Sequence, residues 1–206
     1  MLRGLSLIDI IRDINEPFSE FQAKDIIKDL LYGISYIHNK HFMNRDIKID
    51  NLKYSSLAHN KILKILDFNL GTSFKPGEST ILKTGSEYSS SPQVTLGINY
   101  TEKCDIWSIG IVLYTLLHLY HPYIFNRFDI MKEDIEKTRF TYDFFNYLTI
   151  SDNAKSLLVR LLTYEDSLRP SAESLLSDIL LKAEASNMTD KEKHLIFSNL
   201  KTNLVR

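Results

Sequence analysis

The sequence is poor in the residues that several protein classes require. Cys104 is the only cysteine among 206 residues, which excludes an internal disulfide framework and any cysteine-rich zinc site. The 25 basic and 26 acidic residues nearly cancel and are mixed along the chain, so no surface for nucleic acid or anionic lipid is expected. The apolar run near the N-terminus is interrupted by Arg3, Asp9 and Arg12, which makes it too short for a signal peptide or a membrane span. An intracellular, cytoplasmic globular protein is the resulting expectation.

The first half of the chain predicts a long helix followed by a small β region. Ser19 and Gln22 have the spacing of a capping box, and aliphatic residues recur at helical intervals over residues 26–37. Two aliphatic runs, at residues 42–54 and 61–70, indicate short strands and turns.

The second half predicts one irregular segment and then helices. Residues 71–100 show neither a helical nor an alternating pattern, which is typical of an exposed functional loop. The run at 105–120 is apolar almost all round and predicts a buried helix, while 151–164 and 171–183 begin with good caps and have amphipathic stripes. The fold class expected from these patterns is mainly α with a small β insertion.

Segments in the same order as those of protein kinases occur along the chain. "NRDIKIDN" at 44–51 resembles the catalytic loop H-R-D-L-x-x-x-N, and "DFN" at 67–69 resembles the metal-binding D-F-G. "TGSEYSSSPQ" at 84–93 is similar to the segment that ends in A-P-E, "DIWSIGIVLY" at 105–114 to the buried helix after it, and "DSLRPSAESLL" at 166–176 to the arginine-containing segment near the end of the fold. The chain most resembles the calcium-dependent and calmodulin-dependent serine/threonine kinases.

The resemblance implies only part of a kinase. It covers a C-terminal lobe at residues 1–183, starting just after the hinge, and is followed by a helical tail at 184–206. A complete kinase begins with an N-lobe that carries a Gly-rich loop over the phosphates and a strand lysine. Because Gly4 is the only glycine before Gly33 and no such lysine motif can be found, we expect the N-lobe to be absent.

The resemblance also implies roles for the polar residues of the two central motifs. Asp46 would accept the proton of the substrate hydroxyl, Lys48 would meet the γ-phosphate, and Ser86 would steady both. Asn51 and Asp67 would hold magnesium through oxygen atoms, which this cation prefers. The implied cofactor is Mg-ATP.

Nucleotide binding is nevertheless expected to be weak or absent. Leu66 and Lys53 would lie beside the nucleotide, but Lys53 replaces an aliphatic residue that forms the floor of the adenine site in the family. Without an N-lobe, a concave apolar surface should be left near Leu52 and Leu66, and exposed patches of that kind favour association. Asp50 stands where many relatives with basic substrates have glutamate, which hints at basic substrates.

A further set of residues is expected to be structural. In the family, Asp105 bonds to backbone amides of the catalytic loop, Arg45 can hold a phosphorylated activation loop, and Phe68 belongs to D-F-G. Arg169 pairs with the glutamate of A-P-E, which is Gln93 here, so a hydrogen bond can remain but its charge-assisted share is lost, and the lobe should be looser.

The catalytic segments depart from the family pattern at two more positions. Asn44 replaces the catalytic-loop histidine, and Asn69 replaces the glycine of D-F-G. Asparagine tolerates a left-handed backbone better than most residues, so Asn69 should be the least damaging change.

Three functions remain open from the sequence. The chain is a fragment of an active serine/threonine kinase, completed by a longer gene or by an N-lobe in trans; or it is a degenerate lobe, a pseudokinase, that binds proteins. The third is a regulatory segment that competes for the docking surface of a full-length kinase, because Thr189 and Glu192 form a capping box before the stripe of Ile196, Leu200 and Leu204. Each predicts a protein substrate or protein partner, without nucleic acid or membrane, and the isolated chain is expected to lack appreciable kinase activity.

Overall fold

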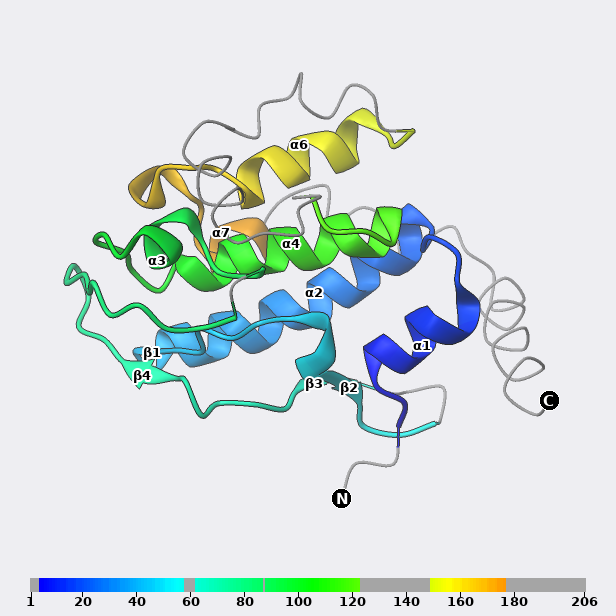
Figure 1. Cartoon of the computed structure of the whole chain (residues 1–206), viewed down its shortest axis with the longest axis horizontal. Coiled ribbons are helices and arrows are strands. Elements are labelled where there is room, and N and C mark those ends of the chain that lie inside the picture. Colours follow the sequence, from blue (N-terminus) through cyan, green and yellow to red (C-terminus); the bar gives the residue numbers. More distant parts are fainter. Residues whose placement is uncertain (1–3, 58–61, 87, 123–148, 177–206) are drawn as a thin grey trace.

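The computed structural model describes residues 4–57, 62–86, 88–122 and 149–176, and these form a mainly helical body with a few short strands (Figure 1). The helices and strands in chain order are α1 (Leu7–Ile14), α2 (Glu20–Asn39), β1 (Phe42–Met43), β2 (Leu52–Tyr54), β3 (Leu63–Ile65), β4 (Thr72–Ser73), α3 (Pro92–Leu96), α4 (Cys104–His118), α6 (Asp152–Leu161) and α7 (Ala172–Leu176), with 3-10 turns η1 (Ile49–Asn51) and η3 (Asp166–Leu168).

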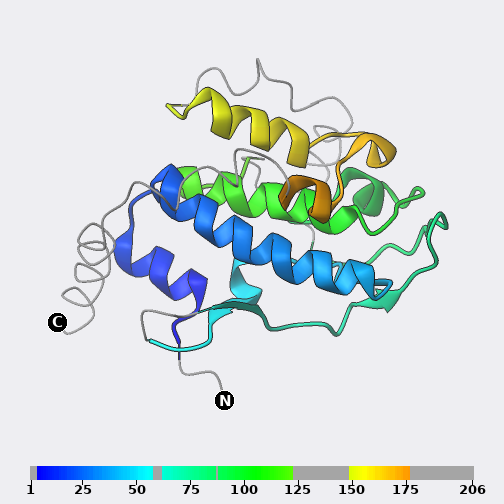
Figure 2. The ribbon, with the colours of Figure 1, turned by 180° about the vertical axis from the view of Figure 1, so that it is seen from behind.

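Helix α2 begins where the capping box predicts. The Ser19 amide donates to Gln22 Oε1 at 2.9 Å, and the Gln22 amide donates to Ser19 Oγ at 3.3 Å. The apolar stripe of α2, including Ile27, Leu31 and Ile34, is fully buried against α4 and α7. Figure 2 shows the short orange helix α7 beside α2. Burial of this face, more than helix propensity, stabilises so long an element.

Helix α4 is the buried helix that the sequence predicts. It is apolar on nearly every side and packs between α2 and α6 (Figure 1). Trp107 is buried in its first half, as expected for a core residue. The helix ends at Leu119, which adopts a left-handed conformation with φ of 62°. Because α4 is embedded in the core, polar side chains near its N-terminus have fixed positions.

The β region consists of two antiparallel pairs rather than one sheet. β1 pairs with β4, and β2 pairs with β3 in the register that sets Leu52 opposite Ile65. Strands β1, β2 and β3 confirm the short strands expected from the two aliphatic runs, whereas β4 lies just after the second run. The pair β2–β3 brings the end of the first run beside the second, and the pair β1–β4 joins the start of the first run to the residues that follow the second.

Helix α1 is anchored against β2. The Tyr54 amide donates to the Leu5 carbonyl at 3.0 Å, and a bridge joins Ser6 to Lys53. Gly4 lies so near this strand that a Cβ atom there would be 2.1 Å from the Tyr54 carbonyl oxygen. Only glycine therefore fits this approach, which places α1 beside the turn η1.

One expectation from the sequence is wrong for residues 71–100, which are not wholly an exposed loop. The segment contains α3, and residues 89–95 are buried. Ser91 caps this helix, Pro92 occupies its first turn, and Gly97 ends it with φ of 70°. A helix of five residues is too short to show a hydrophobic period, so only its caps marked it in the sequence.

Leu52 itself does not contribute to the apolar surface that is expected near it. Leu52 is fully buried in the main core, because alternate residues of β2 face opposite sides and this one faces inward. Leu66 is 47% exposed, as predicted, and Ile62 and Phe68 are exposed nearby.

Two predicted features lie outside the described residues: the latter part of the helix predicted for 171–183, and the tail at 184–206. None of the described helices has the length and apolar character needed to cross a membrane.

Candidate active site

A buried carboxylate on α4 fixes the turn that follows β1. Asp105 Oδ2 accepts the Asn44 amide at 2.8 Å, and Oδ1 accepts the Arg45 amide at 2.7 Å. His38 Nε2 of α2 lies 2.9 Å from the same carboxylate. Asp105 is fully buried, so these partners replace the water that its charge would otherwise lose. The structure therefore places Asp105 in the contacts that the kinase resemblance implies.

Arg45 occupies a strained position in this turn. Its φ of 66° is left-handed, which costs energy for a residue other than glycine. Its guanidinium donates to the Leu70 carbonyl at 2.7 Å through Nε and to Tyr100 Oη at 3.3 Å. Gly85 packs directly against the Arg45 carbonyl. Contacts to three distant segments thus offset the backbone strain at Arg45. The predicted binding of a phosphate to Arg45 stays a prediction.

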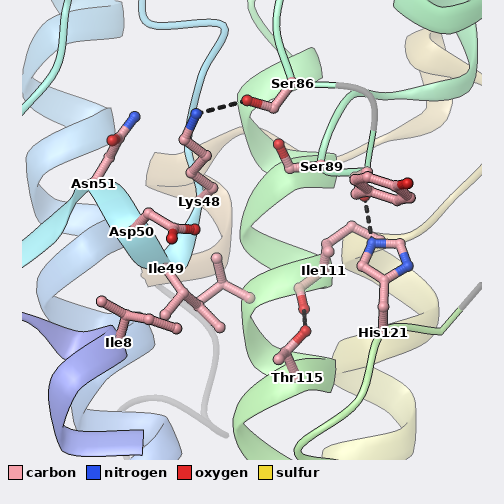
Figure 3. A pocket seen from close by; sticks show the side chains of 12 residues that line it. Ile8, Lys48, Ile49, Asp50, Asn51, Ser86, Ser89, Ile111, Thr115 and His121 are labelled. Carbon is pink, nitrogen blue, oxygen red and sulfur yellow. Dashed lines mark hydrogen bonds between the residues drawn. The ribbon is translucent and has the colours of Figure 1, made fainter. Parts of the chain in front are cut away.

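Three of the predicted catalytic residues form a closed triangle of hydrogen bonds. Lys48 Nζ donates to Ser86 Oγ at 2.7 Å (Figure 3). The same nitrogen lies 2.9 Å from Asp46 Oδ2. Ser86 Oγ donates to Asp46 Oδ1 at 2.6 Å. The side chain of Asp46 is 7% exposed and that of Lys48 is 30% exposed. The Asp46 carboxylate and the Lys48 ammonium are therefore neighbours, at the boundary between core and solvent.

Asn51 joins this cluster from the turn η1. Its Nδ2 donates to the Asp46 backbone oxygen at 3.0 Å and to Asp46 Oδ2 at 2.9 Å. The Leu66 amide donates to the Asn51 carbonyl at 2.9 Å, which puts Asp67 next in line. Asp67 Oδ1 accepts the Asn69 amide at 2.8 Å. The two predicted magnesium ligands thus come from paired strand ends.

Asn51 and Asp67 have the chemistry to hold a magnesium ion that is also coordinated by a bound phosphate group. Asn51 turns its amide nitrogen to Asp46, which leaves the amide oxygen at the other end of the group for a cation. Asp67 adds carboxylate oxygen, and both are hard ligands. The described residues contain no group of three or more histidine, cysteine or acidic side chains that could hold a metal by themselves. Substrate phosphate and water would have to complete the coordination.

Asn44 contributes to the site in a way that the sequence did not indicate. This residue is fully buried. Its Nδ2 donates to the Asp67 backbone oxygen at 2.6 Å, and its Oδ1 accepts the Asp46 amide at 3.0 Å. The available signal in the sequence was the chemistry of the asparagine side chain, whose amide has one donor end and one acceptor end and can therefore bond to two partners. Asn44 therefore connects the predicted base Asp46 to the predicted metal ligand Asp67, although in the sequence it is a departure from the family pattern.

Asn69 does not need the conformational freedom of the glycine that it replaces. The described non-glycine residues with positive φ are Asn15, His41, Arg45 and Leu119. Asn69 is absent from this set, so its backbone carries no left-handed strain. Asparagine can replace the family's glycine here because the backbone at this position does not require a positive φ.

The structure also places Lys53, which was predicted to lie beside the nucleotide, and Phe68, which was predicted to be structural. Lys53 lies on β2 directly across from Lys64, a like-charged neighbour. Phe68 is 40% exposed, and its ring centroid is 6.3 Å from that of Phe42. The predicted position of Lys53 beneath an adenine stays a prediction.

Arg169 and Gln93 form the neutral pair that the sequence predicts. Arg169 Nη2 donates to Gln93 Oε1 at 3.1 Å, and Gln93 Nε2 donates to the Tyr164 carbonyl at 2.6 Å. Arg169 is fully buried, 5.3 Å from the centroid of the Trp107 ring. Asp166 Oδ1 lies 3.4 Å from Nη1 and supplies a carboxylate that the sequence did not reveal.

Comparison with known families identifies the fold in which the cluster around Asp46 lies. The family described as protein kinase domain matches residues 1–181. The chain belongs to the protein kinase family. The segments of the chain that resemble kinase motifs are thus parts of one kinase domain match, and the triangle of Asp46, Lys48 and Ser86 lies within it.

The kinase relatives are calcium-dependent enzymes. The chain is 37% identical to "Calcium-dependent protein kinase 4" of Plasmodium falciparum over 171 residues, which are 82% of this chain and 32% of that relative. It is 38% identical to the protein of the same name in Plasmodium berghei over 161 residues, 77% of the chain and 30% of the relative. It is 29% identical over 181 residues to the "Calcium and calcium/calmodulin-dependent serine/threonine-protein kinase" of Pisum sativum, 88% of the chain and 34% of the relative. The chain therefore spans about a third of the length of these serine/threonine kinases, and its predicted likeness to the calcium-dependent group is confirmed.

Proposed function

We propose that the chain is the C-terminal lobe of a serine/threonine protein kinase and supplies the residues that receive the substrate hydroxyl in ATP-dependent phosphoryl transfer. The observation that carries the proposal is the triangle of Asp46, Lys48 and Ser86. The lobe at residues 1–183 and the tail at 184–206 belong to the same proposal, as do a protein substrate and an intracellular, cytoplasmic location.

The geometry of the triangle suits Asp46 for the role of base. Hydrogen bonds from Lys48 and Ser86 hold its carboxylate in one orientation, so a serine or threonine hydroxyl would meet an acceptor that is already positioned. In transfer the hydroxyl oxygen would bond to the γ-phosphorus of ATP as the bond from that phosphorus to the β–γ bridging oxygen breaks and ADP leaves, while the hydroxyl proton would pass to an Asp46 oxygen. Lys48 is partly exposed beside that oxygen, where its ammonium would stabilise negative charge on the transferring phosphate.

Mg-ATP would occupy the side of the cluster formed by Asn51 and Asp67. Magnesium supplies neutralisation of the phosphate charge when it is bound. Asn51 would offer its amide oxygen while its amide nitrogen holds Asp46, and Asn44 would fix the backbone of Asp67. Leu66 would contact the nucleotide from the position just after β3, and Lys53 would contact it from β2.

The 206 residues taken as a separate polypeptide would bind nucleotide poorly. They contain no Gly-rich loop or strand lysine to donate to the β- and γ-phosphates, and Lys53 replaces an apolar floor. We expect affinity to fall on the order of 10³-fold relative to a complete kinase, with transfer reduced further because nothing aligns the γ-phosphate. This expectation concerns these residues alone, whether or not they belong to a longer protein.

Calorimetry with Mg-ATP beside a phosphate-transfer assay tests both parts. The matched control is Asp46→Asn, which keeps the shape but removes the base. We expect no micromolar binding and no transfer by the chain, and transfer that depends on Asp46 when an N-lobe is supplied in trans. Micromolar binding together with transfer that disappears in Asp46→Asn would show the chain to be a minimal kinase. Transfer that persists in Asp46→Asn would remove Asp46 from the mechanism.

One observation favours a second function. In this alternative the chain is a degenerate lobe that binds proteins, or a regulatory segment that acts on a full-length kinase. Ile62, Leu66 and Phe68 are exposed together near β3, at 52%, 47% and 40%. Exposed apolar side chains grouped in this way are typical of association surfaces. A pull-down without nucleotide should recover a partner from wild type and not from Phe68→Asp, and recovery by both would argue against this surface.

A further inference from the structure

The side chain of Tyr100 connects the turn that carries the proposed base to the loop that follows β4. Its hydroxyl donates to the Leu82 carbonyl at 2.6 Å and accepts a hydrogen bond from Arg45 Nη1 at 3.3 Å. A guanidinium can only donate, so the single hydroxyl proton goes to Leu82 and an oxygen lone pair faces Arg45. Tyr100 is 1% exposed, and its ring packs in a small buried cluster with Met43. This burial fixes the ring and, with it, the direction of both hydrogen bonds.

The backbone of Tyr100 holds the same loop. The Thr80 amide donates to the Tyr100 carbonyl at 2.9 Å, and the Tyr100 amide donates to the Thr80 carbonyl at 3.0 Å. The Thr80 hydroxyl oxygen accepts the Leu82 amide at 3.3 Å. Side-chain burial adds little here, because Ile81 and Leu82 are each 62% exposed. Residues 80–82 are thus held mainly by hydrogen bonds to Tyr100.

The loop returns to the catalytic turn a few residues later. Gly85 lies so close to the turn that a Cβ atom there would be 2.6 Å from the Arg45 oxygen. The next residue, Ser86, donates its hydroxyl proton to Asp46 Oδ1 at 2.6 Å. The turn therefore contacts one short loop at two points, through Tyr100 and directly at residues 85–86. Because few residues separate these points, displacement of the loop at one of them also displaces it at the other.

We propose that Tyr100 is a positioning residue for phosphoryl transfer, which orients the Asp46 carboxylate by joining Arg45 to the loop that carries Ser86. The inference rests on the proposed function, because it takes Asp46 as the base. Arg45 has a left-handed backbone with φ of 66°, so its place in the turn depends on the partners of its side chain. Its Nε donates to the Leu70 carbonyl, and its contact with the Tyr100 hydroxyl is the one that reaches the loop before Ser86.

Backbone NMR relaxation of the 206-residue chain tests this connection without requiring catalysis. Tyr100→Phe removes the hydroxyl and keeps the ring in its buried cluster. We expect the amide order parameters of Ile81 and Ser86 to fall from about 0.85 to below about 0.6, because the loop loses its side-chain anchor. The amide resonance of Asp46 should shift, since the turn is no longer joined to that loop. The signal of Leu113, within the buried helix α4, should keep its order parameter and its position.

Two further variants show whether the hydroxyl acts through Arg45. Tyr36→Phe, at a 66% exposed position of α2, is the matched control and should change none of these signals. Arg45→Met removes the guanidinium, so adding Tyr100→Phe to it should shift the Asp46 resonance little further. Unchanged order at Ile81 in Tyr100→Phe, or a loop that moves while the Asp46 resonance stays in place, would overturn the proposal. A full further shift in the Arg45→Met background would also overturn it, because the hydroxyl would then act on the turn by another route.

The positioning role and the proposed function fail separately in this design. With an N-lobe supplied in trans, Tyr100→Phe should lower kcat about 10-fold and leave the KM for ATP unchanged, because it misplaces the base and not the nucleotide. A loop and turn that respond to Tyr100→Phe, while transfer proves independent of Asp46, keep the structural connection and reject the proposed catalytic role. Transfer that depends on Asp46 but has the same kcat in Tyr100→Phe does the reverse.

Discussion

The side-chain amide of Asn44 donates to the backbone oxygen of Asp67 at 2.6 Å, across 23 positions of sequence. The other end of the same amide accepts the Asp46 amide at 3.0 Å. One buried side chain thus ties the proposed base to a proposed metal ligand. The family has a histidine at this position, and here an asparagine holds the two segments together.

Replacing Asn44 by leucine should therefore destabilise the chain. The substitution keeps the approximate volume but leaves the Asp67 oxygen and the Asp46 amide buried without their partner. We expect the free energy of unfolding to fall by about 1–3 kcal/mol in urea denaturation. Asn153→Leu, at an exposed position of α6, is the control and should change it by less than about 0.5 kcal/mol. Equal effects of the two substitutions would show that the Asn44 contacts contribute nothing.

Asp105→Asn should lower the free energy of unfolding by more than the burial of this side chain alone suggests. The neutral amide can accept from only one end, so of the Asn44 and Arg45 amides one loses its acceptor. We expect a loss of roughly 2–4 kcal/mol, measured as the shift of the urea midpoint. Asp152→Asn on the exposed surface of α6 removes a carboxylate that faces water and should cost less than about 1 kcal/mol. A loss below that of the control would mean that other contacts orient the turn.

Two glycines allow close packing to be separated from backbone strain. Gly85 has φ of 109°, and a Cβ there would lie 2.6 Å from the Arg45 oxygen, whereas Gly77 has φ of 81° and open space around it. Gly77→Ala should cost about 1–2 kcal/mol through strain alone. Gly85→Ala should cost clearly more and should shift the amide resonances of Arg45 and Asp46 in an NMR spectrum. Similar costs for the two variants would contradict the close approach.

His118 should make stability depend on pH. Burial lowers the pKa of His118 below its ordinary value of 6.5, and the ring packs 4.6 Å from that of Tyr114. Its Nε2 is buried without a partner among the described residues. The unfolded chain therefore binds a proton at higher pH than the folded chain, so this stability is present above the unfolded pKa and lost as pH falls towards the folded pKa.

Urea denaturation at pH 7.5 and at lower pH values tests this dependence. Wild type should lose stability as the pH falls below about 6.5. His118→Phe, which cannot titrate and retains the ring contact, should lose less over the same interval. An identical pH dependence in both proteins would assign the titration to other groups.

Gln93→Glu should not strengthen the contact with Arg169 in the way that the family pattern suggests. The carboxylate would gain a charge-assisted bond to the guanidinium, but it would face the Tyr164 carbonyl that Gln93 Nε2 now satisfies at 2.6 Å. Because the gain and the loss are of similar size, we expect a change in unfolding free energy within about 1 kcal/mol. A stabilisation well above that value would show that the Tyr164 contact is dispensable.

Local features of the sequence determined much of this protein. The spacing of Ser19 and Gln22 set the start of α2, and the nearly continuous apolar run of residues 105–120 predicted a helix that is buried on almost every side. The order of the motifs identified the kinase family and the catalytic candidates. These features are readable because caps, periods and motifs depend on residues a few positions apart.

Only the tertiary structure decided how the candidates meet. Ser86 bonds to Asp46 across 40 positions, and Asp105 bonds to the Asn44 amide across 61. The same packing turned Leu52 into the core and gave Asn44 its two partners. Such contacts follow from how α4 and the strand pairs lie in space, because a buried polar group takes the partner that packing leaves within reach rather than the one nearest in sequence.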